Sequence, residues 1–259
     1  MHARAVFAMA LPIVVAAAPA YAQADNCRNL PSHSAVKKAL SAAQAEANGG
    51  LGFHMWATVV DRDGVVCVVA FTGADRGDQW PGSRVISAQK ANTANAFSLP
   101  KFALSTANLF SAVQPGQSLF GLQESNPVDT GAAYGGNAAL FGAVNDPLKG
   151  RRVGGVNVFG GGLALYTQTG SIVGGLGVSG DTSCADHIIA WKVRHALNLD
   201  NVPAGVAGSD KDNIIHDVTV DAGTGHTVSK GGFGHPTCSA ESTKIAGDLP
   251  KTHPPGSTP

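Results

Sequence analysis

The chain has 259 residues, no formal net charge at pH 7, and charged side chains at only 14% of its positions. A neutral chain without a basic stripe gives no electrostatic reason to expect nucleic acid or a membrane surface as a partner. Glycine occupies 33 positions, against roughly 7% of residues in an average protein. The shortage of charge indicates that other copies of the chain cover part of the surface, which predicts a homo-oligomer. The alternative is a glycine-rich monomer with long loops.

The first residues have the pattern of a cleavable export signal. Arg4 provides a positive charge, and an almost unbroken apolar run extends from Ala5 to Ala18. Ala20-Tyr21-Ala22 then matches a small-residue cleavage site, so the predicted mature chain begins at Gln23. An uncleaved anchor is the alternative, although a spanning helix needs ~20 apolar residues. The sequence thus predicts a signal peptide at residues 1–22 and a periplasmic or secreted protein.

The first elements of the mature chain combine helices with a hairpin. Ser32 can cap a helix that runs to about Asn48, with alanine, valine and leucine at helical spacing on its buried side. The β-rich runs Phe53–Asp61 and Val65–Thr72 are joined through an Asp-Gly turn, which predicts a hairpin. A second helix is expected from Ser83 to about Phe97.

The middle of the chain is irregular and then returns to regular structure. Residues 113–135 form a predicted long loop, and loops of that length are usually functional or disordered. Short strands are predicted at Gly155–Phe159, Leu163–Thr167 and Ser171–Val178, the last two as a second hairpin. A third helix is expected from Ser183 to about Leu199, with one apolar stripe facing the sheet.

Beyond Leu199 the chain is rich in glycine and proline. One strand is expected at Ile214–Val220, and residues 245–259 lack any periodic pattern, which predicts a disordered tail. Residues 23–199 are therefore expected to form one domain, and residues 200–244 its extension. Because hairpins are mixed with helices, without regular βαβ alternation, the predicted fold class is α/β of the α+β kind, a largely antiparallel sheet flanked by helices.

The run Gly175-Leu176-Gly177-Val178-Ser179-Gly180 matches the dinucleotide-binding pattern G-x-G-x-x-G between a strand and a helix. A dinucleotide fold needs a parallel strand after that helix. Here the helix leads into Asn201-Val202-Pro203, and the strand before it belongs to a hairpin. We therefore expect no nicotinamide cofactor. A narrower prediction is that free N–H groups of this turn, at a helix N-terminus, bind a carboxylate or another anion.

The predicted mature chain keeps four cysteines: Cys27, Cys67, Cys184 and Cys238. An even number in an oxidising compartment favours two disulfides. Cys184 and His187 form C-x-x-H, while His235 and Cys238 form H-x-x-C, so these residues are also a plausible tetrahedral zinc set. The compartment favours a Cys184–Cys238 disulfide, which leaves Cys27 to pair with Cys67.

A Cys184–Cys238 bridge would bring His187 and His235 into one neighbourhood, because bridged Cα atoms lie about 5–6 Å apart. Two imidazoles close together outside the core could ligate haem iron or another metal ion. The sequence therefore predicts His187 and His235 as metal ligands.

One face of the third helix carries His187, Trp191, Arg194 and His195, opposite its apolar stripe. Imidazole, indole and guanidinium groups suit a flat ligand that bears propionates. His187, His235, Trp191 and Arg194 are accordingly the predicted cofactor site. The alternative is a solvated helix face along which Arg194 extends its aliphatic stem.

Other polar residues have less support as ligands or catalysts. His54 lies on the first predicted strand, where a lone histidine is more often structural, and nothing near His33 supports a ligand role. Glu124, Asp129 and Asp146 lie in or beyond the long loop without an identifiable partner. Spacing alone therefore gives no acid–base pair.

Several segments together resemble the GlcG/HbpS haem-binding family. The glycine-rich block Gly160–Gly180 continues into Ser-Gly-Asp-Thr-Ser-Cys-Ala-Asp-His at Ser179–His187, and Gly-His-Pro-Thr-Cys follows at Gly234–Cys238, as in exported members. Val59–Gly64 looks like the first hairpin of that family, and Ala88–Ala91 looks like its alanine-lysine helix.

The resemblance covers about residues 32–199 and implies a profilin-like core, with a five-stranded antiparallel sheet flanked by helices. It also implies homo-oligomers and haem binding. Two departures stand out. Thr72–Arg76 replaces the Arg-Met-Asp-Gly-Ala segment common after the first hairpin, and the chain beyond residue 199 has no counterpart in the minimal domain.

Two hypotheses about function follow. The favoured one is an exported, oligomeric ligand-binding protein that binds haem. The alternative is an enzyme acting on a small oxygenated or aromatic compound at the Gly175–Gly180 turn, beneath the 113–135 loop, with His187 or Glu124 as base. A haemin titration followed by visible absorption separates the two.

Overall fold

The structure is a computed structural model that describes residues 26–256, so the predicted signal peptide lies outside the described residues. Helix α1 (His33–Ala45) is capped by the side chain of Ser32, as predicted. The predicted hairpin follows as β1 (Trp56–Asp61) and β2 (Val66–Phe71). The second predicted helix is α2 (Ser83–Ala96).

The second half of the core also lies close to its predicted bounds. Strands β3 (Gly162–Tyr166) and β4 (Ile172–Ser179) form the second hairpin, and α4 (Ser183–Ala196) follows with Thr182 as its cap. The 113–135 segment is irregular up to the short helix α3 (Thr130–Tyr134). Single 3-10 turns occur at η1 (Asn26–Asn29), η2 (Thr106–Leu109), η3 (Ser111–Val113), η4 (Ala138–Leu140) and η5 (Gly208–Asp210).

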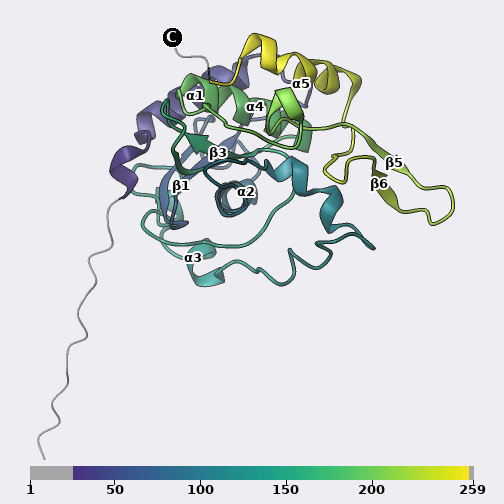
Figure 1. Ribbon diagram of the computed structural model, residues 1–259. Helices are drawn as coiled ribbons and strands as arrows, with labels where there is room; N and C mark the ends of the chain where they lie inside the picture. The colour runs from purple at the N-terminus through teal and green to yellow at the C-terminus, as the bar shows by residue number, and fades with distance from the viewer. Residues whose placement is uncertain (1–25, 257–259) are drawn as a thin grey trace, which may run out of the picture.

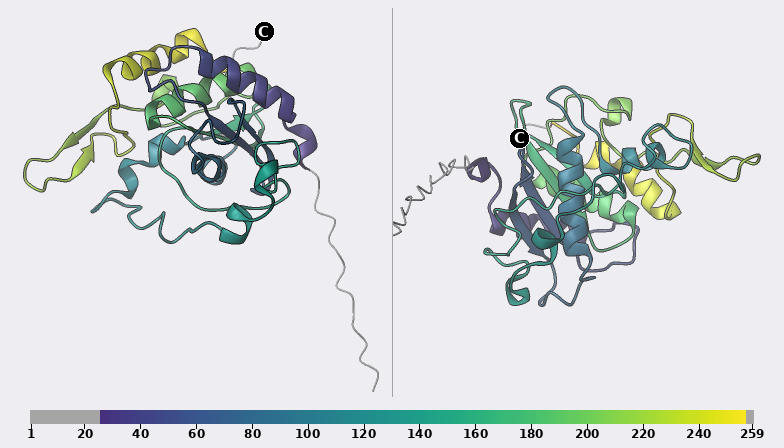
Figure 2. Two further views of the ribbon diagram at one scale, coloured as in Figure 1. Left: turned by 180° about the vertical axis from the view of Figure 1, so that it is seen from behind. Right: turned by 90° about the horizontal axis from the view of Figure 1, so that it is seen from below.

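The four strands form one antiparallel sheet in the order β2-β1-β4-β3. Helix α2 covers one face, while α1 and α4 cover the other (Figures 1 and 2). Each face has its own apolar cluster. Val36, Leu40 and Ile188 belong to the cluster on the α1 and α4 side, and Val85, Ala88 and Ala91 to the cluster under α2. Burial on both faces explains why β1 and β3 are entirely buried.

The glycines of β4 allow α2 to lie directly on the sheet. A Cβ atom on Gly177 would stand 1.9 Å from the Ser87 carbonyl oxygen, and one on Gly175 would stand 2.3 Å from that of Ala91. A larger residue at either position would therefore push the helix away. The glycines of the G-x-G-x-x-G pattern here serve close packing of a helix on the sheet.

The antiparallel sheet flanked by helices confirms the predicted fold class, with four strands in this sheet where five were expected. Residues 155–159 stay out of the sheet, because Val156 and Val158 pack with Leu109 and Val113 in a separate apolar cluster. The strand predicted at Ile214–Val220 is reduced to β5 (Val218–Val220), which pairs with β6 (Thr227–Ser229). This hairpin projects from the body of the molecule (Figure 2).

Both predicted disulfides are present. Cys27 is bonded to Cys67 with Cα atoms 5.4 Å apart, and Cys184 to Cys238 with Cα atoms 6.0 Å apart. Within residues 26–256, no helix has the length and apolar character that a membrane crossing requires.

The disordered tail predicted for residues 245–259 is wrong for the part that the structure describes. Helix α5 (Ala240–Thr252) begins with a capping box formed by Ser239 and Ser242. Its Ala246 and Leu249 side chains are buried against the core, and the Trp191 indole N–H donates to the His253 carbonyl at 2.8 Å. The helix is stabilised by these contacts with the core, which the few apolar residues before Pro250 did not indicate.

Replacing Leu249 by alanine should therefore lower the free energy of unfolding by about 2–5 kcal/mol, because this side chain is fully buried. Chemical denaturation checks the value. Lys251→Ala, at an exposed position of the same helix, is the control and should change stability by less than about 0.5 kcal/mol. If the Leu249→Ala variant unfolded at the same denaturant concentration as the wild type, α5 would not contribute to the cooperative core.

Candidate functional site

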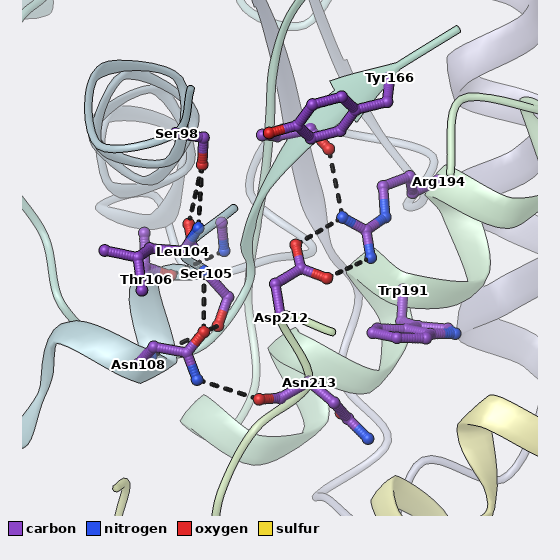
Figure 3. Close-up of polar contacts among 12 residues, drawn as sticks. Ser98, Leu104, Ser105, Thr106, Asn108, Tyr166, Trp191, Arg194, Asp212 and Asn213 are labelled. Carbon is purple, nitrogen blue, oxygen red and sulfur yellow. Dashed lines mark hydrogen bonds and ion pairs between the residues drawn. The ribbon is translucent and has the colours of Figure 1, made fainter. Parts of the chain in front are cut away.

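The helix face predicted to hold haem is buried, so the expectation of an exposed face is wrong. Arg194 has no exposed side-chain surface and forms a bidentate ion pair with Asp212, at 2.7 and 2.8 Å (Figure 3). Its guanidinium also donates to the Ala164 carbonyl at 3.2 Å and lies 4.9 Å from the centre of the Trp191 ring. The extension beyond residue 199 supplies Asp212 and covers this face. Both terminal nitrogens of the Arg194 guanidinium are therefore already paired with Asp212, and neither is free to bind a propionate.

The two predicted metal ligands are also inside the protein. His187 is completely buried, and its Nε2 accepts the Ile214 N–H at 3.1 Å. The ring nitrogens of His235 contact the Ser183 hydroxyl and the Pro236 carbonyl, both at 2.7 Å. Burial lowers the pKa of His187 to about 3 and that of His235 to about 4, so both are neutral at pH 7. Their role as iron ligands stays a prediction that requires this face to open.

The remaining sequence candidates have separate positions. His195 contacts Asp200 at 2.7 Å near the end of α4. His54 is exposed and contacts the Thr72 hydroxyl at 3.0 Å. Among the carboxylates, Glu124 is exposed and Asp129 caps α3.

The glycine-rich turn before α4 does not present free N–H groups, so the predicted anion cradle is wrong. The Asp181 N–H donates to Asp186 at 2.9 Å, and the Thr182 N–H donates to the Asp181 carboxylate at 2.5 Å. Asp181 also accepts the N–H groups of Leu51 and Phe53. Two carboxylates of the chain itself thus occupy the positive end of the helix dipole.

The 113–135 loop does not cover the glycine-rich turn. The alternative hypothesis of an enzyme site at this turn, beneath the loop, is therefore wrong about the position of the loop. Helix α2 lies over the glycines of β4, as described above. The loop packs elsewhere, with Leu119 and Leu122 against Leu109 and Val113. Glu124 and His187 therefore do not share a cavity that could hold a substrate.

One open cavity, which we call the Trp80 crevice, lies between the N-terminal ends of α2 and α4. Its volume is about 370 Å³, and half-exposed Trp80 and Phe159 stand at its mouth. At its base a buried ion pair joins Lys90 to Asp186 at 2.7 Å. Burial raises the pKa of Asp186 to about 6 and lowers that of Lys90. With Asp181 also in the lining, this crevice carries no excess of positive charge.

A second cavity, the His33 cleft, lies between α1, the end of β2 and residues 139–144. Its volume of about 410 Å³ is within the range of ligand pockets, ~300–1,000 Å³. Phe71, Phe141 and Val144 give it apolar walls. Its polar lining consists of His33, Lys37, Asp75 and Arg76. Three basic groups thus face one carboxylate, which suits an anionic ligand with a large apolar body.

Two buried features hold the walls of the His33 cleft. The Cys27–Cys67 disulfide ties the segment before α1 to β2. On the opposite wall, Asp146 accepts the Gly142 N–H at 2.6 Å and forms a buried ion pair with Arg84, whose guanidinium lies 3.6 Å from the centre of the Phe141 ring. Asp146, for which the sequence indicated no partner, is therefore a positioning residue for this wall.

His33 is held between the two walls. Its Nε2 lies 2.8 Å from the Gly142 carbonyl oxygen, to which it can donate, and this contact fixes the orientation of the ring. Gly142 itself has φ +77°, and a Cβ there would stand 2.1 Å from the Phe71 ring, so only glycine fits. Sequence reasoning missed this site, because the residues that surround His33 come from segments more than a hundred residues apart.

Comparison with known proteins gives a family. The model of the family described as haem-degrading protein HbpS-like matches residues 32–194. The chain belongs to this HbpS-like family. This confirms the resemblance inferred from the glycine-rich block and the alanine-lysine helix. No curated protein sequence matches the chain.

Solved structures of HbpS-like proteins are among those similar to this chain. A PduOC–haem complex is 25% identical over 64% of this chain and 91% of its own, with a TM-score of 0.45. Klebsiella pneumoniae protein ORFY is 24% identical over 64% and 90% of the two chains, with a TM-score of 0.43. HbpS itself is 20% identical over 71% and 99%, with a TM-score of 0.39.

The HbpS-like match divides the candidate residues into two groups. The lining of the His33 cleft and of the Trp80 crevice lies entirely within residues 32–194. Asp212, His216 and His235 lie outside it, in the extension that buries the predicted haem face. Both cavities thus lie in the part of the chain that matches the family model, whereas the extension lies outside it.

Removing the partner of Arg194 should be strongly destabilising. We expect Asp212→Ala to lower the free energy of unfolding by about 3–5 kcal/mol, because it leaves an uncompensated charge in the core. Urea denaturation gives the value, with Glu124→Ala as a control at an exposed carboxylate. Equal stability of the two variants would mean that Arg194 reaches solvent.

Stability should also depend on the neutral state of His235. Its folded pKa of about 4 lies below the unfolded value of 6.5, so its contribution is complete above pH 6.5 and is lost as the pH falls towards 4. The loss amounts to about 3 kcal/mol. His235→Gln should be less stable than wild type at pH 7 but should lose less stability between pH 6.5 and 4. Parallel pH profiles of the two proteins in urea denaturation would contradict this assignment.

Proposed function

We propose that this protein is an exported, homo-oligomeric haem-binding protein and that haem binds in the His33 cleft. The observation that carries the proposal is the composition of the cleft, in which an imidazole and two flexible cations surround aromatic walls. Membership of the HbpS-like family supports haem as the ligand. The two disulfides and the predicted signal peptide support export.

Charge favours the His33 cleft over the Trp80 crevice. Haem carries two propionates, and guanidinium and ammonium groups bind carboxylates through charge-assisted hydrogen bonds. Arg76 contacts Asp75 at 3.8 Å with both side chains about half exposed or more, so this pair is weak and can be exchanged for a propionate. Lys37 lies 5.1 Å from the centre of the Phe71 ring. In the Trp80 crevice, by contrast, Lys90 is already paired with Asp186, and Asp181 adds a second carboxylate.

The His33 imidazole is the residue of this cleft that fits haem iron. The His33 imidazole would hold the iron of bound haem through a ring nitrogen. Ligating histidines generally donate their second ring N–H to a carbonyl or carboxylate. The His33–Gly142 contact has this character when Nε2 is the protonated nitrogen, which leaves the lone pair on Nδ1.

The oligomer is proposed from the low fraction of charged residues. Light scattering at micromolar concentration should give a mass several times that of the 26.2 kDa precursor chain. A mass equal to that of one processed chain would contradict the assembly without bearing on the cleft.

The haem site is tested by titrating haemin into purified protein and following the Soret band. His33→Ala should weaken binding at least tenfold and change the spectrum, because it removes the iron ligand. Lys37→Ala and Arg76→Ala should weaken binding several-fold with little spectral change, because they contact only propionates. Lys38→Ala is the matched control, since Lys38 is exposed on the same helix and outside the cleft.

Two other outcomes would move or remove the site. A spectrum unchanged in His33→Ala but altered in the His187→Ala, His235→Ala double variant would place haem on the buried face after it opens. No binding of haemin by the wild type would overturn the proposed function.

A further inference from the structure

His216 is a partly buried imidazole whose two ring nitrogens are shielded from solvent. Neither nitrogen has a hydrogen bond of ordinary geometry within residues 26–256, although the backbone of His235 and Pro236 lies close by. Burial lowers its pKa, so the ring is neutral and retains a lone pair. A buried polar group without a hydrogen bond is unfavourable, and in a native protein an ion or a water molecule is one of the explanations for it.

Three potential metal ligands converge at this point. A ring nitrogen of His216, a ring nitrogen of His235 and the sulfur of Cys184 lie within 4.8 Å of one another. Cys238 is bonded to Cys184 and is the fourth group. In a tetrahedral zinc site, bonds of about 2.0–2.3 Å place the ligand atoms roughly 3–4 Å apart. A contraction of about 1 Å would therefore bring the three ligand atoms to one ion.

His235 is already oriented for such a role. Its two ring nitrogens contact Ser183 and Pro236. Whichever nitrogen binds a metal, the other keeps a hydrogen bond of the kind that orients metal-bound histidines. Burial keeps this imidazole neutral, as ligation requires.

We propose that the Cys184–Cys238 disulfide masks a zinc site formed by Cys184, Cys238, His216 and His235. A thiol reductant opens this disulfide by thiol–disulfide exchange. The sulfur–sulfur bond takes up two electrons and two protons and becomes two thiols, while the reductant becomes a disulfide. Zinc then displaces both thiol protons and binds two thiolates and two imidazoles, a known structural zinc set. Exchange with an oxidised low-molecular-weight disulfide re-forms the Cys184–Cys238 bond, converts that disulfide into two thiols and releases the ion.

This set differs from the one suggested by the sequence, in which His187 was the second imidazole. His187 is not among the three convergent ligands: its Nε2 accepts the Ile214 N–H, and its Nδ1 is buried without a hydrogen-bond partner within residues 26–256. His216, which no sequence motif pointed to, takes its place because the extension folds back beside the disulfide. The zinc site is independent of the haem proposal, since none of its four residues lines the His33 cleft.

The test is cobalt binding, because cobalt reports the geometry and thiolate ligation of a zinc site. Cys27→Ser, Cys67→Ser serves as the parent protein, since it removes the other disulfide and the neighbouring Cys27–Asp61–Cys67 group. After reduction with a phosphine without air, the parent should bind one Co²⁺ with thiolate charge-transfer bands and intense tetrahedral bands. Zinc should displace the cobalt. The oxidised parent should show no thiolate bands.

Single variants identify the ligands. His216→Ala and His235→Ala should each weaken cobalt binding at least tenfold, whereas His187→Ala should bind as the parent does. His226→Ala is the matched control, because His226 is exposed in the β5–β6 turn of the same extension. If the parent fails to fold by circular dichroism, the same comparisons are made in the fully reduced wild type.

Three results would overturn the zinc site. The first is the absence of stoichiometric cobalt binding by the reduced protein, whether folded or unfolded. The second is binding by His216→Ala equal to that of His226→Ala. The third is a loss of binding in His187→Ala in place of His216→Ala.

Discussion

The buried ion pair between Arg194 and Asp212 determines how the C-terminal extension lies on the core. Both side chains are inaccessible to solvent, and both oxygens of Asp212 are used by the guanidinium (Figure 3). Two charges are costly to bury, so this arrangement requires near-complete pairing. It fixes the segment that also places Asn213 and Ile214 against His187. The second face of α4 thereby becomes core, and α5 can pack beside Trp191.

Local patterns predicted the sheet and its helices well. The Asp-Gly turn between β1 and β2, the cap at Ser32 and the apolar stripe of α4 are all signals carried by neighbouring residues. The two disulfides could also be predicted, because four cysteines allow only three pairings. The burial of Arg194 could not be predicted in this way, because its partner lies in a segment without periodic structure. The sequence of a polar helix face does not show whether its side chains form hydrogen bonds with water or with a carboxylate of the same chain.

The two cavities show the same limit for the site. Sequence spacing singled out residues that share a helix, whereas the His33 cleft joins α1 to the residues after β2 and to a loop near residue 142. Arg76 belongs to the Thr72–Arg76 segment in which this chain departs from its family's pattern. Both segments contain one arginine and one aspartate, so the departure shifts the positions of these charges along the chain and keeps their number. In this chain the shift places Asp75 and Arg76 in the lining of the His33 cleft.

The two disulfides act on different parts of this arrangement. Cys27–Cys67 anchors the start of α1 and hence the His33 side of the cleft, so it lowers the ordering cost of a ligand there. Cys184–Cys238 lies beside an imidazole without a hydrogen bond of ordinary geometry and holds two sulfurs that would otherwise be metal ligands. Reducing conditions would thus loosen the proposed haem cleft while creating a zinc site in the extension. Oxidising conditions would do the reverse. Because the two proposed sites share no residue, each disulfide would act on its own site, and reduction of one would not directly alter the other.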